Sequence, residues 1–494
     1  MRLSGGTALT LLSPAKLWDY SLIALTSAGS LVLLYFSPQL ALGLVLGLAA
    51  VLYFSNRIQH LLYFLIFYLP LEEFVLKWVD YSIYPALRYG LELVIYATLF
   101  KVVLEKLARN QKIVSSPIDI PLLLLAGLGL ISTFLNGLPI LAGVLGLRPF
   151  LRYAALFYLI LNSNLPKESL PRLFKVILVI ALFEVGISLA QYLIGDPANQ
   201  FLKAKDLVVG QTIIDAREKW QDYYAGQKIF GTLGRYNLLG AFLVGVLTLL
   251  LGYRFEKKRL SFYKGSLLVG ALLVLLLTYS RLSWIGLLAA IVTLLIIKQK
   301  KKWVLALGLV GFWAVMLFSS QGISLYQSEV RGSLKDRLLG PFTSDYWAMS
   351  GSSQRLFAVS QVASTVSGPN LLLGYGPGTL GSLVTNLQEG VSQLHRIGDT
   401  QKLLVIGDVG WMALLGQLGL LGVVLFIWIL SRMFKRGLSV YRSSEEFWQK
   451  TFALALCAYL VALVAMNFFS LAFEARVSSA YFWIIAGLAC RQYA

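Results

Sequence analysis

The side chains best suited to chemistry in this sequence are arginines at the edges of apolar segments. Arg281 is the clearest, because it alone separates the apolar runs 264–280 and 282–297, where a charge is costly. Arg235 directly precedes another apolar run, and Arg355 lies in a polar segment further along. A guanidinium keeps its charge and binds phosphate through paired hydrogen bonds. Several arginines at one membrane face therefore suit an oligoanion, although any single one can instead snorkel to lipid phosphates.

Neighbouring polar residues could help to bind such an anion. The candidates for substrate binding, besides Arg235, are Arg217, Asn237, Tyr279 and Arg337. The segment 353–367 around Arg355 has apolar residues at helical spacing, which predicts a short amphipathic helix. Such a helix could lie on the membrane surface or pack over the mouth of a helical bundle.

Two residues could move a proton near these arginines. His395 could act as a general base near neutral pH, although a lone histidine in a loop is more often incidental. Asp408 directly precedes a long apolar run, where it could receive a proton or cap the helix. The catalytic candidates are therefore Arg281, Arg355, His395 and Asp408.

The composition shows which kind of element must hold these residues. Of the 494 residues, 57% are hydrophobic and 14% are charged, against roughly 45–50% and about 25% in soluble domains. The mean hydropathy of +0.72 is as high as these two fractions lead one to expect, and together they exclude a soluble globular enzyme. The net charge of +19 would suggest nucleic acid in a polar protein, but here it fits loops that flank membrane helices. Two cysteines in apolar runs exclude a disulfide framework and a cysteine-based metal site.

Runs long enough to cross a bilayer predict an all-α, polytopic bundle of about 14 transmembrane helices in one membrane domain, 1–494. The predicted spans are 19–36, 40–55, 58–78, 85–101, 120–136, 147–163, 170–194, 237–253, 264–280, 282–297, 303–319, 409–431, 449–469 and 477–490. Short connecting segments on one side are rich in Lys and Arg, which predicts cytoplasmic N- and C-termini. The long loops 195–237 and 320–407 then face outward, and the second contains the amphipathic helix.

Ionisable residues also occur inside the spans, where they are costly unless paired or hydrated. They are Glu72, Glu73, Glu92 and Glu184, with Arg88 and Arg152 near outer span ends. Ion pairs within the bundle are the ordinary interpretation, and an ion or proton pathway is the alternative.

The glycine-rich stretch 374–378 has the wrong spacing for a dinucleotide fingerprint, and no lysine typical of a phosphate-binding loop follows it. We interpret it as a tight external turn that returns the chain toward the membrane.

Taken in order, the outward motifs resemble those of the O-antigen ligase and polymerase superfamily of bacterial envelope proteins. The resemblance covers residues 231–422 and rests on Gly231-x-x-x-x-Tyr236-Asn237, Ser280-Arg281-x-x-Trp284-x-Gly286, Arg355 in a loop helix, Gly374-x-Gly376-Pro377-Gly378 and Asp408-x-Gly410-Trp411. Ser280-Arg281 and Gly374 to Gly378 are moderately specific together and weak singly.

The resemblance implies a metal-independent transfer, without a cofactor, of an oligosaccharide carried on undecaprenyl diphosphate. An acceptor sugar hydroxyl would attack the anomeric carbon at the outer face of the bacterial inner membrane. The arginines would stabilise the leaving diphosphate, and a carboxylate or imidazole would activate the hydroxyl. The expected partners are the lipid-linked oligosaccharide, the acceptor glycan, membrane lipids and a flippase or chain-length regulator, but no nucleic acid.

One departure from the family concerns the histidine that lipid A-core ligases typically carry just before the span after the large loop. Here Gly407-Asp408 occupies that place, which favours a polymerase over a lipid A-core ligase. Some relatives are labelled as bicarbonate transporters, so transport stays an alternative. No internal repeat supports it.

Overall fold

The computed structural model describes most of the chain outside the large loop. The described residues are 23, 38–79, 84–203, 207–209, 212–214, 228–257, 259–300, 302–303, 359–360, 362–363, 365–380, 409–468 and 470–492. The predicted spans 19–36 and 303–319 lie almost wholly outside these ranges.

The described part is a bundle of apolar helices with one two-stranded ribbon. The helices of the first half are α2 (Pro38–Asn56), α3 (Ile58–Leu76), α4 (Tyr84–Ala108), α5 (Asp119–Leu135), α6 (Ile140–Leu151), α7 (Ala154–Asn162), α8 (Ser169–Ile194) and α9 (Asp196–Leu202). The second half has η1 (Gly231–Leu233), α11 (Tyr236–Glu256), α12 (Phe262–Leu277), α13 (Arg281–Ile297), α18 (Pro369–Leu373), α21 (Gly410–Ser443), α22 (Phe447–Met466) and α23 (Arg476–Cys490). Strands β1 (Leu207–Val209) and β2 (Thr212–Ile214) pair antiparallel within the predicted loop 195–237.

Five of the described helices are long and apolar enough to cross a membrane, namely α3, α8, α11, α21 and α22. The pair α6 and α7 passes the same test together, but it is bent by 57°. Shorter apolar helices are Gly43–Asn56, α5, α12, α13 and α23. These helices make the chain a helical membrane protein, whereas the total of 14 spans and the side of each terminus stay predictions from the sequence.

Two predicted spans differ in form from the helices observed. The span 147–163 begins earlier, at Ile140, and breaks around Arg152. The span 409–431 is the first part of a helix that continues to Ser443, with a non-helical backbone at Gly419 (φ 66°, ψ −171°). Neither break was predicted, because the mean hydropathy of both spans stays high despite Arg148, Pro149 and Arg152 in the first and Gly419 in the second.

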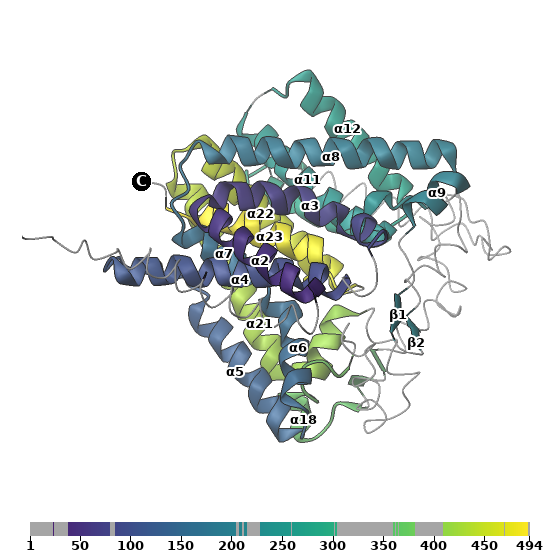
Figure 1. Ribbon diagram of the computed structural model, residues 1–494. Coiled ribbons are helices and arrows are strands. Elements are labelled where there is room, and N and C mark those ends of the chain that lie inside the picture. The colour runs from purple at the N-terminus through teal and green to yellow at the C-terminus, as the bar shows by residue number, and fades with distance from the viewer. Residues whose placement is uncertain are drawn as a thin grey trace, which may run out of the picture.

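The centre of the bundle is formed by α22 and α23, which α11, α13 and α21 surround (Figure 1). Every residue of α23 is buried. Small residues bring the helix backbones close together, as is usual inside membranes. Gly245 of α11 faces the Tyr459 ring, and Gly487 of α23 faces Ile160 of α7.

A second group of helices, α5, α6, α18 and the first part of α21, lies at the lower side of Figure 1. The glycine-rich stretch 374–378 is wedged among them. Gly376 donates its N–H to the Gln417 carbonyl (2.9 Å), and Gly378 donates to the Gln417 side chain (3.0 Å). A Cβ on Gly146 would lie 2.1 Å from the Gly378 nitrogen. This turn is therefore buried between helices, which the sequence did not predict, while its place on the outward side stays a prediction.

The described part of the predicted amphipathic helix, 353–367, packs against the protein. Val362 and Val366 are buried in a small cluster with Leu380, Val409 and Ala413. Of the two alternatives, these contacts favour a segment that packs over the beginning of α21.

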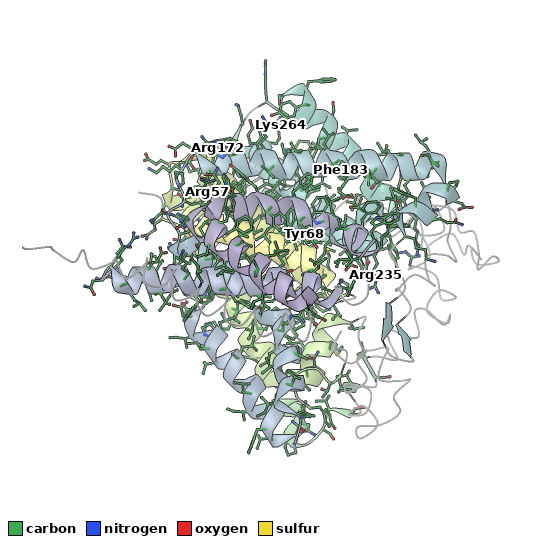
Figure 2. The ribbon with its side chains drawn as sticks, viewed as in Figure 1. Arg57, Tyr68, Arg172, Phe183, Arg235 and Lys264 are labelled. Carbon is green, nitrogen blue, oxygen red and sulfur yellow. The ribbon has the colours of Figure 1, made fainter. Side chains whose placement is uncertain are left out.

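The ends of the helices gather at two opposite ends of the bundle, as the alternating crossings predict. Arg235 marks the end where α11 and α13 begin, which we call the arginine end; Arg57 and Arg172 lie at the opposite end (Figure 2). At the opposite end, Lys298 after α13 pairs with Glu256 of α11, and Arg491 donates to Ser163 after α7.

Candidate functional site

The structure brings the starts of α11 and α13 together at the arginine end. The contact runs through Gly240 of α11, where an added Cβ would lie only 2.1 Å from the Ser283 hydroxyl oxygen of α13. Ile229, before α11, donates its N–H to the carbonyl of Leu277 at the end of α12 (3.5 Å). Arg235 and Arg281, predicted from separate motifs, therefore belong to neighbouring helix starts.

The tip between α12 and α13 has a defined shape that places Arg281. Tyr279 adopts a left-handed backbone with φ 54°. The Thr278 hydroxyl donates to the Leu275 carbonyl and accepts from the Ser280 N–H. Ser280, the residue preceding the helix, shares a hydrogen bond of 2.8 Å with the Ser283 hydroxyl. These short polar side chains satisfy the backbone at the turn, so Arg281 becomes the first residue of α13.

The turn before α11 is held by polar side chains of α8. The Gln191 side-chain oxygen accepts the N–H groups of Phe230 (3.0 Å) and Gly231 (2.9 Å). The Glu184 carboxylate accepts the Thr232 N–H (3.2 Å) and its hydroxyl. Glu184 thus anchors the segment that leads to Arg235 through hydrogen bonds, and among the described residues it forms no ion pair, unlike the other acids expected to be paired. Sequence reasoning missed Gln191, since an uncharged side chain in a span gives no signal.

Asn237 follows this turn in the first turn of α11. Its side-chain oxygen is buried and has no hydrogen-bond partner among the described residues. A buried amide oxygen without a partner is costly, and a ligand hydroxyl could satisfy it. The role of Asn237 in binding substrate stays a prediction.

A third sequence motif, which contains Gly410 and Trp411, lies at the same end of the bundle and is connected to α13 by the end of α22. A Cβ on Gly410, at the start of α21, would lie 2.5 Å from the Asn467 side-chain oxygen after α22. A Cβ on Gly286 of α13 would lie 2.7 Å from Met466. Met466 and Asn467 therefore connect the beginning of α21 with the first turns of α13.

Three motif helices, α11, α13 and α21, thus begin at one end of the bundle. A helix start carries partial positive charge and N–H groups that bind anions. With Arg235 and Arg281 at two of these starts, the arginine end is chemically suited to a phosphate-bearing ligand.

A separate ionic cluster lies inside the bundle, between α3, α4, α6 and α23. Glu92 is its centre, because its carboxylate accepts from Arg148 (2.5 Å) and Arg476 (2.9 Å) and lies 3.8 Å from Arg152. Arg476 also pairs with Glu72 at 2.7 Å. The interpretation of these charges as ion pairs is confirmed. A further pair at the cluster's edge joins Arg88 and Glu73 at 3.0 Å.

Sequence reasoning missed three members of this cluster: Arg148, Glu474 and Arg476. Glu474 lies in the short segment between α22 and α23, where its backbone carbonyl accepts from Arg152. Complete burial raises the pKa of the Glu474 carboxyl to about 8, against a smaller opposing effect of Arg152. One of its carboxyl oxygens has no hydrogen-bond partner among the described residues.

Five predicted site residues lie outside the described residues, namely Arg217, Arg337, Arg355, His395 and Asp408. Within the described ranges, no group of three or more His, Cys, Asp and Glu side chains is arranged to hold a metal ion.

No protein-family model matches the sequence, and no curated protein matches it.

Proposed function

We propose that this membrane protein is a glycan polymerase or ligase that transfers an oligosaccharide from a lipid diphosphate to an acceptor sugar hydroxyl. The reaction takes place at the arginine end, which faces outward in a bacterial inner membrane. A polymerase is favoured over a lipid A-core ligase, because the histidine typical of the ligases is replaced by Gly407-Asp408.

The observation that carries the proposal is the contact between Gly240 and Ser283, which makes the starts of α11 and α13 neighbours. Two arginines from separate sequence motifs, Arg235 and Arg281, then stand at adjacent helix starts. A diphosphate carries the opposite charge and accepts hydrogen bonds from guanidinium groups and helix N–H groups alike.

In the proposed reaction, the acceptor oxygen bonds to the anomeric carbon while the bond from that carbon to the diphosphate breaks. The electron pair leaves with the diphosphate, where Arg281 and Arg355 stabilise the added charge. The hydroxyl proton passes to a base, for which His395 and Asp408 are the candidates. Arg235, Arg217, Arg337, Asn237 and Tyr279 bind the substrate.

The test is polymer formation by Arg281→Ala in cells that depend on this protein. We expect a loss of at least about 100-fold, since removal of one preorganised charge-stabilising donor costs roughly that much. Arg172→Ala, at the opposite end, is the matched control and should retain polymer. The same amounts of each protein must be present in the membrane. Polymer at the original level with Arg281→Ala would overturn the proposal.

A secondary transporter is the second candidate, and the bent pair α6 and α7 favours it. Broken helices with ionisable residues near the middle of the membrane are typical of transporters. Here Arg148 and Arg152 lie beside the 57° bend. Purified protein in sealed vesicles distinguishes the two, because substrate-driven solute uptake would favour transport, whereas elongation of lipid-linked glycan would favour transfer.

A further inference from the structure

A polar pocket of about 470 Å³ opens at the end of the bundle opposite to Arg235 and Arg281. Its walls come from the corner between α2 and α3, the last turns of α4, and the segment 162–166 between α7 and α8. Arg57 marks this end in Figure 2. The proposed glycan transfer makes no use of this pocket, which therefore needs a separate explanation.

The pocket gathers positive charge from separate parts of the chain. Arg57, Lys106 and Arg109 line it, together with His60. Among its described lining residues Glu105 is the only acid, and its carboxylate already lies 3.7 Å from the ammonium of Lys101. The lining thus presents more cationic than anionic groups.

Hydrogen bonds hold several of these groups in place. The Tyr53 hydroxyl bonds to the His60 ring nitrogen (2.9 Å) and accepts from Arg57 (3.5 Å), whose guanidinium also lies over the Tyr53 ring. The Asn162 side-chain oxygen accepts from Lys106 (3.3 Å). These contacts fix the side chains of Arg57, His60 and Lys106 at the wall of the pocket.

Arg491, which is not itself a lining residue, adds positive charge next to the pocket wall. Arg491, after α23, donates to the hydroxyl of Ser163, which lines the pocket, at 2.9 Å. Like charges brought together repel one another, and an anion in the pocket would offset that repulsion.

We propose that this pocket binds a phosphate group through Arg57, His60, Lys106 and Arg109. Tetrahedral phosphate oxygens can accept from several such donors at once. Basic pockets between membrane helices are known to suit phospholipid headgroups, and the volume is that of an ordinary small-ligand site. The phosphate is carried either by an anionic lipid or by a soluble compound.

The experiment compares both sources on the full chain in a neutral, phosphate-free detergent. Inorganic phosphate is titrated at constant ionic strength, and retention of phosphatidylglycerol against phosphatidylcholine is measured by native mass spectrometry. The variant Lys106→Gln/Arg109→Gln should weaken the binding of phosphate, of phosphatidylglycerol, or of both at least tenfold. The matched control Arg172→Gln/Lys175→Gln removes two charges at the same end, outside the pocket, and should change binding less than twofold.

A second variant, Lys106→Arg, keeps the charge and should retain binding, which separates loss of the site from loss of the fold. Retention of phosphatidylglycerol without a response to phosphate supports a lipid headgroup, and the reverse supports a soluble phosphate. Equal weakening in the variant and its control would overturn the proposal, as would the absence of saturable binding of either probe.

Discussion

The arginines of the ionic cluster and those of the arginine end are placed by different physical means. Arg148 and Arg476 point into the bundle and share the carboxylate of Glu92. Arg281 stands where a helix begins, and the turn before it is built by neutral hydroxyls of Thr278, Ser280 and Ser283. The difference teaches that an arginine within apolar sequence can be positioned either by a buried acid or by the turn with which a helix begins.

The comparison predicts first that the ionic cluster is needed for folding. Glu92→Gln removes the charge that Arg148, Arg152 and Arg476 share, so buried positive charge is left uncompensated. We expect the free energy of unfolding to fall by about 3–5 kcal/mol. Denaturant unfolding in detergent measures it.

Glu73→Gln is the control for this prediction. Glu73 pairs with Arg88 at the edge of the cluster, and its side chain is 29% exposed. Its loss should cost about 1 kcal/mol or less, as for other partly exposed pairs. Equal effects of the two variants would show that Glu92 is not the centre of the cluster.

A second prediction concerns Glu474, beside Arg152 at the edge of the cluster. Its carboxyl has a pKa of about 8 in the folded protein, against an ordinary value of 4.5. Between these values the unfolded chain releases the proton while the folded chain keeps it. The stability that the protonated group contributes is therefore present below about pH 4.5 and is lost as the pH rises to about 8.

Unfolding measured between pH 4.5 and 8.5 checks this dependence, with Glu474→Gln as the comparison. The amide resembles the protonated carboxyl and does not titrate, so the variant should lose that part of the pH dependence, which amounts to a few kcal/mol. An unchanged slope would contradict the prediction.

The third and smallest expected effect on stability is at the arginine end. In Gly240→Ala the new methyl group meets Ser283, so the tip that carries Arg281 must shift. We expect about 1–3 kcal/mol of destabilisation together with a loss of polymer formation. Gly265→Ala is the control, because nothing lies within 4 Å of a Cβ there.

Adding Ser283→Gly to Gly240→Ala removes both Ser283 atoms that crowd the new methyl group, the hydroxyl oxygen at 2.1 Å and the Cβ at 2.8 Å. The double variant should recover part of the polymer. If Gly240→Ala alone leaves polymer formation intact, the position of Arg281 relative to α11 does not matter for activity.

Much of the helical arrangement could be predicted, because hydropathy is a local property. The apolar runs on either side of Arg281 became α12 and α13, and the predicted boundaries of α8 and α23 agree with the structure within a few residues. The ion-pair interpretation of Glu72, Glu73 and Glu92 was also correct, since an isolated charge in a membrane is too costly to persist.

What could not be predicted depends on contacts between distant residues. The bend between α6 and α7 follows Pro149 and includes Arg152, and the other break is at Gly419, but prolines and glycines also occur inside unbroken membrane helices, so these residues alone did not predict the breaks. Residues 374–378 were interpreted as a turn, but glycine and proline mark exposed and buried turns alike, so their burial between helices was not predicted. Their burial depends on contacts with Gly146 and Gln417, which are distant in the sequence, and a hydropathy pattern does not show which distant residues will be in contact.

The sequence by itself determined that the chain is a helical membrane protein and that Arg281 lies at the tip of a helical hairpin. Both follow from the cost of charge in lipid, which keeps charged residues out of the apolar spans and places them at the span ends. Only the tertiary structure decided which charges are paired. It made Glu92 the partner of Arg148 and Arg476, and it made Gly240 the contact that joins the starts of α11 and α13. Partner choice among helices depends on side-chain shape across an interface, and no single segment of sequence contains that information.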